Sequence, residues 1–151
     1  MIPIFRAKTI KQDYNEWEEY QELKKIDGVW YAIGFYDCKR EVKTYLGDWE
    51  TTHLILIRKS TVISEVKTAE IIDISTLSIH FPDMMDSQGN KIFASLQKNG
   101  RGGDICESKW FNTDVRLTVE IESVRYSNST MIQDGYNISR YEYKKIIGIQ
   151  Q

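Results

Sequence analysis

The fold class of this chain is set by the run VWYAIGFY, Val29–Tyr36. The run is nearly continuous in apolar residues, follows the turn residues Asp27-Gly28, and is too short for a typical helix. Its aromatic and β-branched residues predict a strand buried on both faces. Gly34 inside the run indicates a bulge or the close approach of another backbone.

The same strand pattern continues on both sides of this run. Five further segments favour strands in the first half of the chain: Ile2–Thr9, Glu41–Leu46, His53–Arg58, Thr61–Val66 and Glu70–Phe81. In the second half, Val115–Ile121 alternates apolar and polar residues, Asp134-Gly135 is a hairpin signal, and Arg140–Ile149 reads as a last strand. The chain is therefore predicted to be mainly β, with a minor α component.

One segment has a helical pattern instead. Between Asp13 and Lys25, the residues Trp17, Tyr20 and Leu23 lie three apart, with glutamates early and lysines late, as a helix dipole prefers. Asp13 is a candidate N-cap and Gly28 a candidate stop. We therefore expect a short helix near 13–25. It would lie in a β-rich N-terminal lobe, residues 1–81, followed by a C-terminal lobe, residues 82–151.

Composition narrows the class of protein. The chain has 151 residues, of which 41% are hydrophobic and 28% charged, which is typical of a folded globular protein. A net charge of −2 argues against a strongly cationic nucleic-acid binder. Two cysteines make no disulfide framework, so reduced thiols in the cytoplasm are expected. The start of the sequence lacks the pattern of a signal peptide, and no apolar stretch is long enough for a membrane-spanning helix.

The turn-rich middle of the chain carries a family resemblance. Asp86, Gly89, Lys91, Ile92 and Phe93 are followed by Gly103-Asp104-Ile105. This segment resembles the D-x-x-G-K-x-I-[YF]-x-G-D-I segment of the YopX family of phage and prophage proteins. The opening Ile4–Lys8, the Gly28–Tyr36 segment and the closing Tyr143–Ile149 are similar to other parts of that family.

The resemblance implies a β-rich fold with an SH3-like small β-barrel in the C-terminal half, and it implies no catalytic residues. The residues of the shared segment also have a structural interpretation. Asp86 and Gly89 suit a turn, and Asp104 suits a turn cap or a salt bridge. We therefore expect five residues to be determinants of the fold: Asp86, Gly89, Lys91, Gly103 and Asp104.

The sequence offers little chemistry. His53 and His80 are the only histidines, and neither has the paired Cys or His spacing of a zinc site, so no metal and no cofactor are predicted. His53 is most simply a strand residue and His80 a turn residue. The glycine-rich stretch Asn99–Gly103 lacks the ending of a phosphate-binding P-loop. We expect a protein that is not an enzyme.

A binding role remains. Basic and aromatic residues that could face single-stranded nucleic acid are Lys98, Arg101, Lys109, Trp110 and Arg116. The other interpretation places the aromatic residue in the core and the lysines in solvent. We expect a phage or prophage accessory protein that binds an unknown protein or nucleic-acid partner in the bacterial cytoplasm, with no membrane contact. The alternatives are an oligomeric structural or scaffold protein, or an enzyme of unrecognised type.

Overall fold

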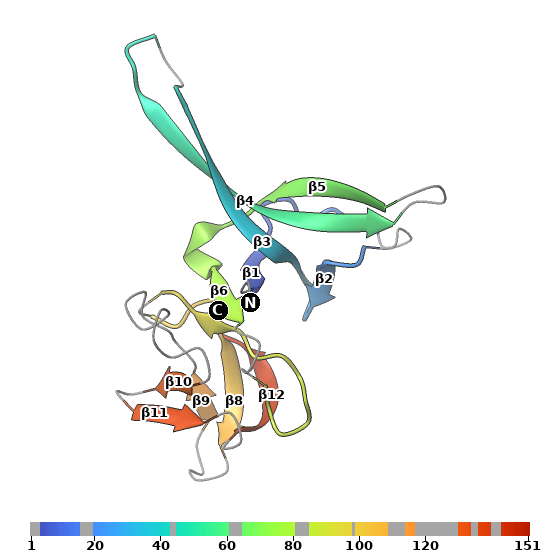
Figure 1. The fold of residues 1–151 in the computed structure, drawn as a ribbon, viewed down its shortest axis with the longest axis vertical. Coiled ribbons are helices and arrows are strands. Elements are labelled where there is room, and N and C mark those ends of the chain that lie inside the picture. Colours follow the sequence, from blue (N-terminus) through green and yellow to red (C-terminus); the bar gives the residue numbers. More distant parts are fainter. Residues whose placement is uncertain are drawn as a thin grey trace. The chain divides into compact units, whose positions relative to one another are not determined.

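Strands make up nearly all the regular structure of the computed structural model (Figure 1), which describes residues 4–15, 20–42, 45–60, 65–80, 85–97, 99–108, 114–116, 130–133, 136–139 and 143–151. The strands are β1 (Ile4–Lys8), β2 (Leu23–Ile26), β3 (Val29–Val42), β4 (Trp49–Ser60), β5 (Glu65–Ile71), β6 (Ser78–His80), β7 (Ala94–Ser95), β8 (Asp104–Ser108), β9 (Asp114–Arg116), β10 (Thr130–Gln133), β11 (Tyr136–Ser139) and β12 (Tyr143–Ile149). A 3₁₀ turn spans Ile74–Thr76. The prediction of a mainly β fold is confirmed.

The strands form three antiparallel sheets. The largest has seven strands in the order β5-β4-β3-β1-β6-β7, with β2 beside β3. The others are β12-β8-β9 and the hairpin β10-β11. In the hairpin Gln133 pairs with Tyr136, so the pairing of the flanking strands confirms the hairpin predicted at Asp134-Gly135.

The predicted helix near 13–25 is wrong. The described part of the chain contains no α-helix: residues 11–15 have no regular structure, and Leu23–Ile26 form β2. Asp27 and Gly28 both have positive φ, 51° and 80°, and close a tight hairpin between β2 and β3. Pairing with β3 therefore overrides the helical spacing. Trp17 lies outside the described residues.

The chain divides into two compact units. The N-terminal unit is Ala7–Ile74, and the C-terminal unit combines Met1–Arg6 with Ser75–Gln151. The sequence-based division lay at 81/82 and assigned the first strand wholly to the N-terminal lobe. In the structure β1 belongs to both units, because the C-terminal unit contains Ile4–Arg6.

The core of the N-terminal unit lies on one face of the strands β3, β4 and β5. Ile55 and Ile57 of β4 are fully buried on this face. Tyr14, Tyr20 and Trp30 make an edge-to-face cluster with ring centroids 5.4–6.3 Å apart, and the Tyr14 hydroxyl donates to Glu70 of β5 at 2.7 Å. The aromatic cluster therefore covers the face that Ile55 and Glu70 share.

Gly34 confirms the predicted close backbone approach. A Cβ at this position would lie 2.1 Å from the carbonyl oxygen of Leu56 on β4. Trp30, Tyr31 and Ala32 are buried, as predicted for a strand covered on both faces, but Phe35 is half exposed. Ile33 is half-buried, so burial on both faces ends before the glycine.

In the C-terminal unit, β6, β7 and β8 surround a small core. Its apolar members include Leu77, Ile79, Ile92, Phe93 and Cys106, all buried. The strand β8 pairs with β12 on one side and β9 on the other, with register shifts at two places along β12. Among the described strands of this unit no closed barrel is formed.

Candidate binding surface

The second face of the β3–β4–β5 sheet exposes apolar side chains. Cross-strand pairing places Phe35, Leu56 and Ala69 in one row across the three strands. The next row is Asp37, Leu54 and Ile71. Phe35 is 50% exposed, Ile71 52% and Leu56 36%, so neighbouring apolar side chains form a continuous patch in solvent. We call this side of the three strands the open face.

Alternation along β4 produces the two faces. Ile55 and Ile57 point into the core, and Leu54, Leu56 and Arg58 point to the open face. On a solvated face polar residues are expected at alternate positions. Leucines at two of these positions indicate a surface that contacts another molecule.

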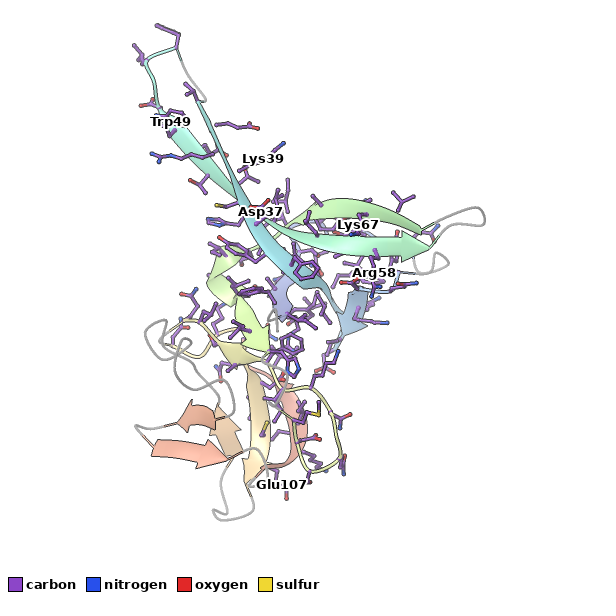
Figure 2. The ribbon with its side chains drawn as sticks, viewed as in Figure 1. Asp37, Lys39, Trp49, Arg58, Lys67 and Glu107 are labelled. Carbon is purple, nitrogen blue, oxygen red and sulfur yellow. The ribbon has the colours of Figure 1, made fainter. Side chains whose placement is uncertain are left out.

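Charged side chains lie at both ends of the patch (Figure 2). Arg58 and Lys67 form a cross-strand pair at one end, and Arg58 also binds Glu22 through its Nε. Asp37 lies toward the other end, beyond Phe35 on the same face of β3. The two ends of the open face therefore differ in sign.

Further out, the acidic end continues along the same face. Glu41 pairs directly with Glu50, and Lys39 lies between Asp37 and Glu41, with its Nζ 3.9 Å from a Glu41 oxygen. Like charges directly opposite each other on paired strands are unfavourable. Even with Lys39, acidic residues predominate here.

Beyond the edge of β5, the strands β3 and β4 continue as a two-stranded ribbon, visible in Figure 1. We call its described residues, 37–42 and 45–53, the arm. Its outer end exposes four large hydrophobic residues: Tyr45 (98%), Leu46 (76%), Trp49 (58%) and Val42 (50%). A two-stranded ribbon by itself is marginally stable, and an exposed apolar tip adds to that cost.

Side-chain contacts along the arm hold its strands together. The Arg40 guanidinium lies over the Trp49 ring, 5.0 Å from its centroid. The Tyr36 hydroxyl shares a hydrogen bond of 2.6 Å with His53 Nδ1, and the two rings stack. Burial and the nearby Cys38 and Asp37 raise the pKa of Tyr36, so it remains a neutral phenol. His53 is a strand residue, as predicted.

The C-terminal unit contains a buried ion pair between distant parts of the chain. Arg6 Nη2 donates to Asp104 Oδ1 at 2.8 Å and to the Gly102 carbonyl oxygen at 2.9 Å. Asp104 Oδ2 accepts from the Phe93 N–H at 2.8 Å, and the guanidinium lies 4.6 Å from the Phe93 ring centroid. Burial raises the pKa of Asp104, and the Arg6 charge and the Phe93 amide act against this rise. The predicted salt bridge of Asp104 is therefore present.

Asp86 forms the predicted turn. Its Oδ1 accepts from the backbone N–H groups of Gln88 and Asn90 at 2.9 and 2.8 Å, and its Oδ2 accepts from the Asn90 side chain. Burial alone would raise the pKa of Asp86, but these hydrogen bonds and one from the Ile146 backbone lower it overall. Gly89 has φ +83°, which glycine adopts without strain. Lys91, at the end of the turn, is exposed and pairs with Met85.

Gly103 is buried and connects two chain segments. Its N–H donates to Gly100 and its carbonyl oxygen accepts from Gln150 N at 2.8 Å. Its neighbour Gly102 has φ +84°, and a Cβ there would lie 2.0 Å from the Thr76 carbonyl oxygen. The glycine-rich stretch thus packs against backbone instead of forming an open phosphate cradle.

Most of the predicted nucleic-acid set lies outside the side chains that the structure describes. Arg101 is half-buried, and its Nη1 donates to the Ser75 hydroxyl at 2.7 Å. Arg116 pairs with Ile105 through the backbone, and its side chain lies outside the described part. Lys98, Lys109 and Trp110 lie outside the described residues altogether.

His80 is not the turn residue that the sequence suggests. It ends β6, is 3% exposed, and its Nδ1 lies 3.0 Å from the Ile92 carbonyl oxygen. Within the described ranges no three Cys, His, Asp or Glu side chains gather as a metal site would require. No helix in those ranges has the length and apolar character to cross a membrane.

Sequence reasoning missed the open face and the arm. The signal was present in His53–Arg58, where Leu54-Ile55-Leu56-Ile57 is apolar at every position. Such a run fits burial on both faces, and only one face is buried here. Comparison with protein-family models, curated proteins and solved structures finds no match for this chain.

Proposed function

We propose that this chain is a non-enzymatic binding module whose arm inserts into an apolar hollow of a partner protein. The observation that carries the proposal is the arm's tip, where Tyr45, Leu46 and Trp49 stand in solvent on a ribbon only two strands wide. Ten large hydrophobic side chains are exposed among the described residues, and nine of them belong to the N-terminal unit. This distribution favours the N-terminal unit as the one that contacts partners.

The charge of the arm favours a protein over a nucleic acid. Residues 37–53 contain three basic residues and four acidic ones. A β-ribbon that enters a groove of DNA must neutralise phosphates, and this composition does not. An apolar tip with an arginine stacked on a tryptophan is typical of protein interfaces, where Trp, Tyr and Arg are enriched.

The place of the protein in biology is proposed from the resemblance to the YopX family of phage and prophage proteins. It is supported by the contact between two of the shared segments, since Arg6 of the opening strand binds Asp104 of the Gly-Asp-Ile segment. On this basis we propose an accessory protein of the bacterial cytoplasm. We also propose that β8 to β12 belong to an SH3-like lobe. The support is that they are short antiparallel strands, in which β8 pairs with β9, β10 pairs with β11, and the last strand, β12, returns to β8.

Site-specific photo-cross-linking tests the arm. A photoreactive amino acid replaces Tyr45, and in a matched control it replaces Ile147, an exposed residue of the C-terminal unit. Both proteins are irradiated in a lysate of phage-bearing bacteria, with and without nuclease. We expect a nuclease-resistant protein adduct from position 45 that is lost in the Trp49→Ser background. Nuclease-sensitive adducts, equal adducts from both positions, or none from position 45 would reject the proposal.

A further inference from the structure

We propose that the open face of the N-terminal unit is covered by a second copy of this chain. The surface consists of two adjoining rows, Phe35-Leu56-Ala69 and Asp37-Leu54-Ile71, with Arg58 and Lys67 in the row before them. This inference rests on the apolar rows of the open face, and the arm proposal rests on the tip residues Tyr45, Leu46 and Trp49, so either can fail without the other.

The distribution of charge on the open face favours a second copy of this chain as the partner. Leu56 lies midway between the row of Arg58 and Lys67 and the row of Asp37, about 6.7 Å from each along the strands. Consider a two-fold axis that lies between the two packed faces and runs across the strands at Leu56. It reverses the strand direction and places Leu56 of one copy against Leu56 of the second. The cationic end of each copy then faces the Asp37 end of the other. The surface is therefore complementary to itself, as an isologous interface requires.

Contacts with neighbouring residues restrict the positions of the charged side chains of Arg58 and Asp37. The Glu22 carboxylate holds Arg58 through its Nε, which fixes the guanidinium beside the sheet. Asp37 Oδ1 accepts from the Cys38 N–H at 2.8 Å, which restricts that carboxylate. Figure 2 shows Arg58 and Lys67 together near one end of the sheet, with Asp37 and Lys39 following each other toward the arm. Preorganised charges lose less freedom on association.

The size of the face indicates a weak dimer. The three rows centred on Leu56, across three strands, cover roughly 300 Å² per copy before side-chain relief is counted. Stable interfaces bury about 800 Å² per partner. We therefore expect reversible association with a dissociation constant in the micromolar range or weaker, strengthened at low salt because unlike charges face each other.

Sedimentation velocity from about 1 μM to 1 mM tests the proposal. We expect the weight-average mass of the wild-type protein to rise toward that of a dimer, and Leu56→Asp to keep the mass of a monomer. Val66→Asp is the matched control, because Val66 is 42% exposed on β5 but lies on the other side of the sheet. A wild-type protein that remains monomeric overturns the proposal. So does dimerisation that Leu46→Asp at the arm tip abolishes and Leu56→Asp leaves intact.

A charge exchange keeps the test valid if Leu56→Asp fails to fold. Asp37→Lys and Lys67→Glu should each weaken self-association at least tenfold at low salt. An equal mixture of the two variants should associate again, because the row with the new lysine in one copy faces the row with the new glutamate in the other. Failure of the mixture to associate more than the single variants would overturn the assignment.

Discussion

The two units of this chain place their side chains in opposite ways. The C-terminal unit buries a charged pair, Arg6 and Asp104, at 5% and 1% exposure, and the N-terminal unit leaves Phe35 and Ile71 about half exposed. A buried charge requires a partner of opposite sign, and the C-terminal unit supplies one for Arg6 and for Asp104. An exposed apolar patch gains stability only when another surface covers it. The difference indicates that the first arrangement holds the fold and the second serves contact with other molecules.

The largest expected effect is on the buried pair. Arg6→Ala or Asp104→Ala should lower the free energy of unfolding by about 3–5 kcal/mol, since each leaves a buried charge without its partner. The double change Arg6→Met, Asp104→Leu should cost less than either, because it removes both charges. Urea unfolding measures these values, and hydrogen exchange should show the loss in the C-terminal unit. Equal losses in both units would weaken the distinction between them.

Two neighbours on one strand sharpen the comparison. Ile55→Ala should cost about 2–5 kcal/mol because its side chain fills the core. Leu56→Ala should change stability by about 0.5 kcal/mol in dilute solution, where the open face has no cover. Thermal unfolding of the two variants at low micromolar concentration compares them. Similar losses at both positions would mean that the face is covered within the chain.

The next largest loss of stability is expected at Gly102. Gly102→Ala places a Cβ against the Thr76 backbone and forces alanine into a left-handed conformation, which alone costs about 1–2 kcal/mol. Gly148→Ala is the control, because nothing lies within 4 Å of a Cβ there. Chemical denaturation should separate the two clearly, and equal stabilities would contradict the close packing at Gly102.

The smallest expected effect is on how the free energy of unfolding changes with pH. The pKa of Asp86 is lowered on folding, so the unfolded chain binds a proton more tightly between the unfolded pKa, about 3.9, and the lower folded value. The stability that Asp86 contributes is therefore full above that range and lost as the pH falls through the folded pKa. Asp86→Asn should flatten the loss of stability below about pH 5. An identical slope in wild type and Asp86→Asn would refute this role.

Local signals in the sequence predicted much of the fold. The turn at Asp86, the close approach at Gly34, the hairpin around 134–135 and the strand β12 all follow from turn chemistry and strand patterns that depend on near neighbours. These features need no knowledge of distant contacts.

Long-range effects account for what the sequence did not predict. The spacing of Tyr20 and Leu23 fits a helix face, but pairing of Leu23–Ile26 with β3 selects the strand. The sequence shows Asp104 as a candidate for a salt bridge, but the partner, Arg6, is 98 positions away. Which face of β4 becomes the core side depends on where Tyr14 and Tyr20 pack, and no local pattern encodes that.

The site residues show the same limit. A basic and aromatic composition suggested a nucleic-acid surface. Of that set the structure describes the side chain of Arg101, whose guanidinium donates to the Ser75 hydroxyl within the same unit. The open face is built from rows contributed by three strands, and a single-strand pattern does not show which residues become neighbours across a row.

The most direct test of the central claim is hydroxyl-radical footprinting of the wild-type protein at low and high concentration, read residue by residue by mass spectrometry. We expect Phe35, Leu56 and Ile71 to lose reactivity toward hydroxyl radicals as the protein concentration rises. Ile10 and Ile147, which are exposed at 63% and 46% elsewhere, should keep theirs. Unchanged reactivity at the open face, or equal protection at all five residues, would contradict the claim that this face is a contact surface.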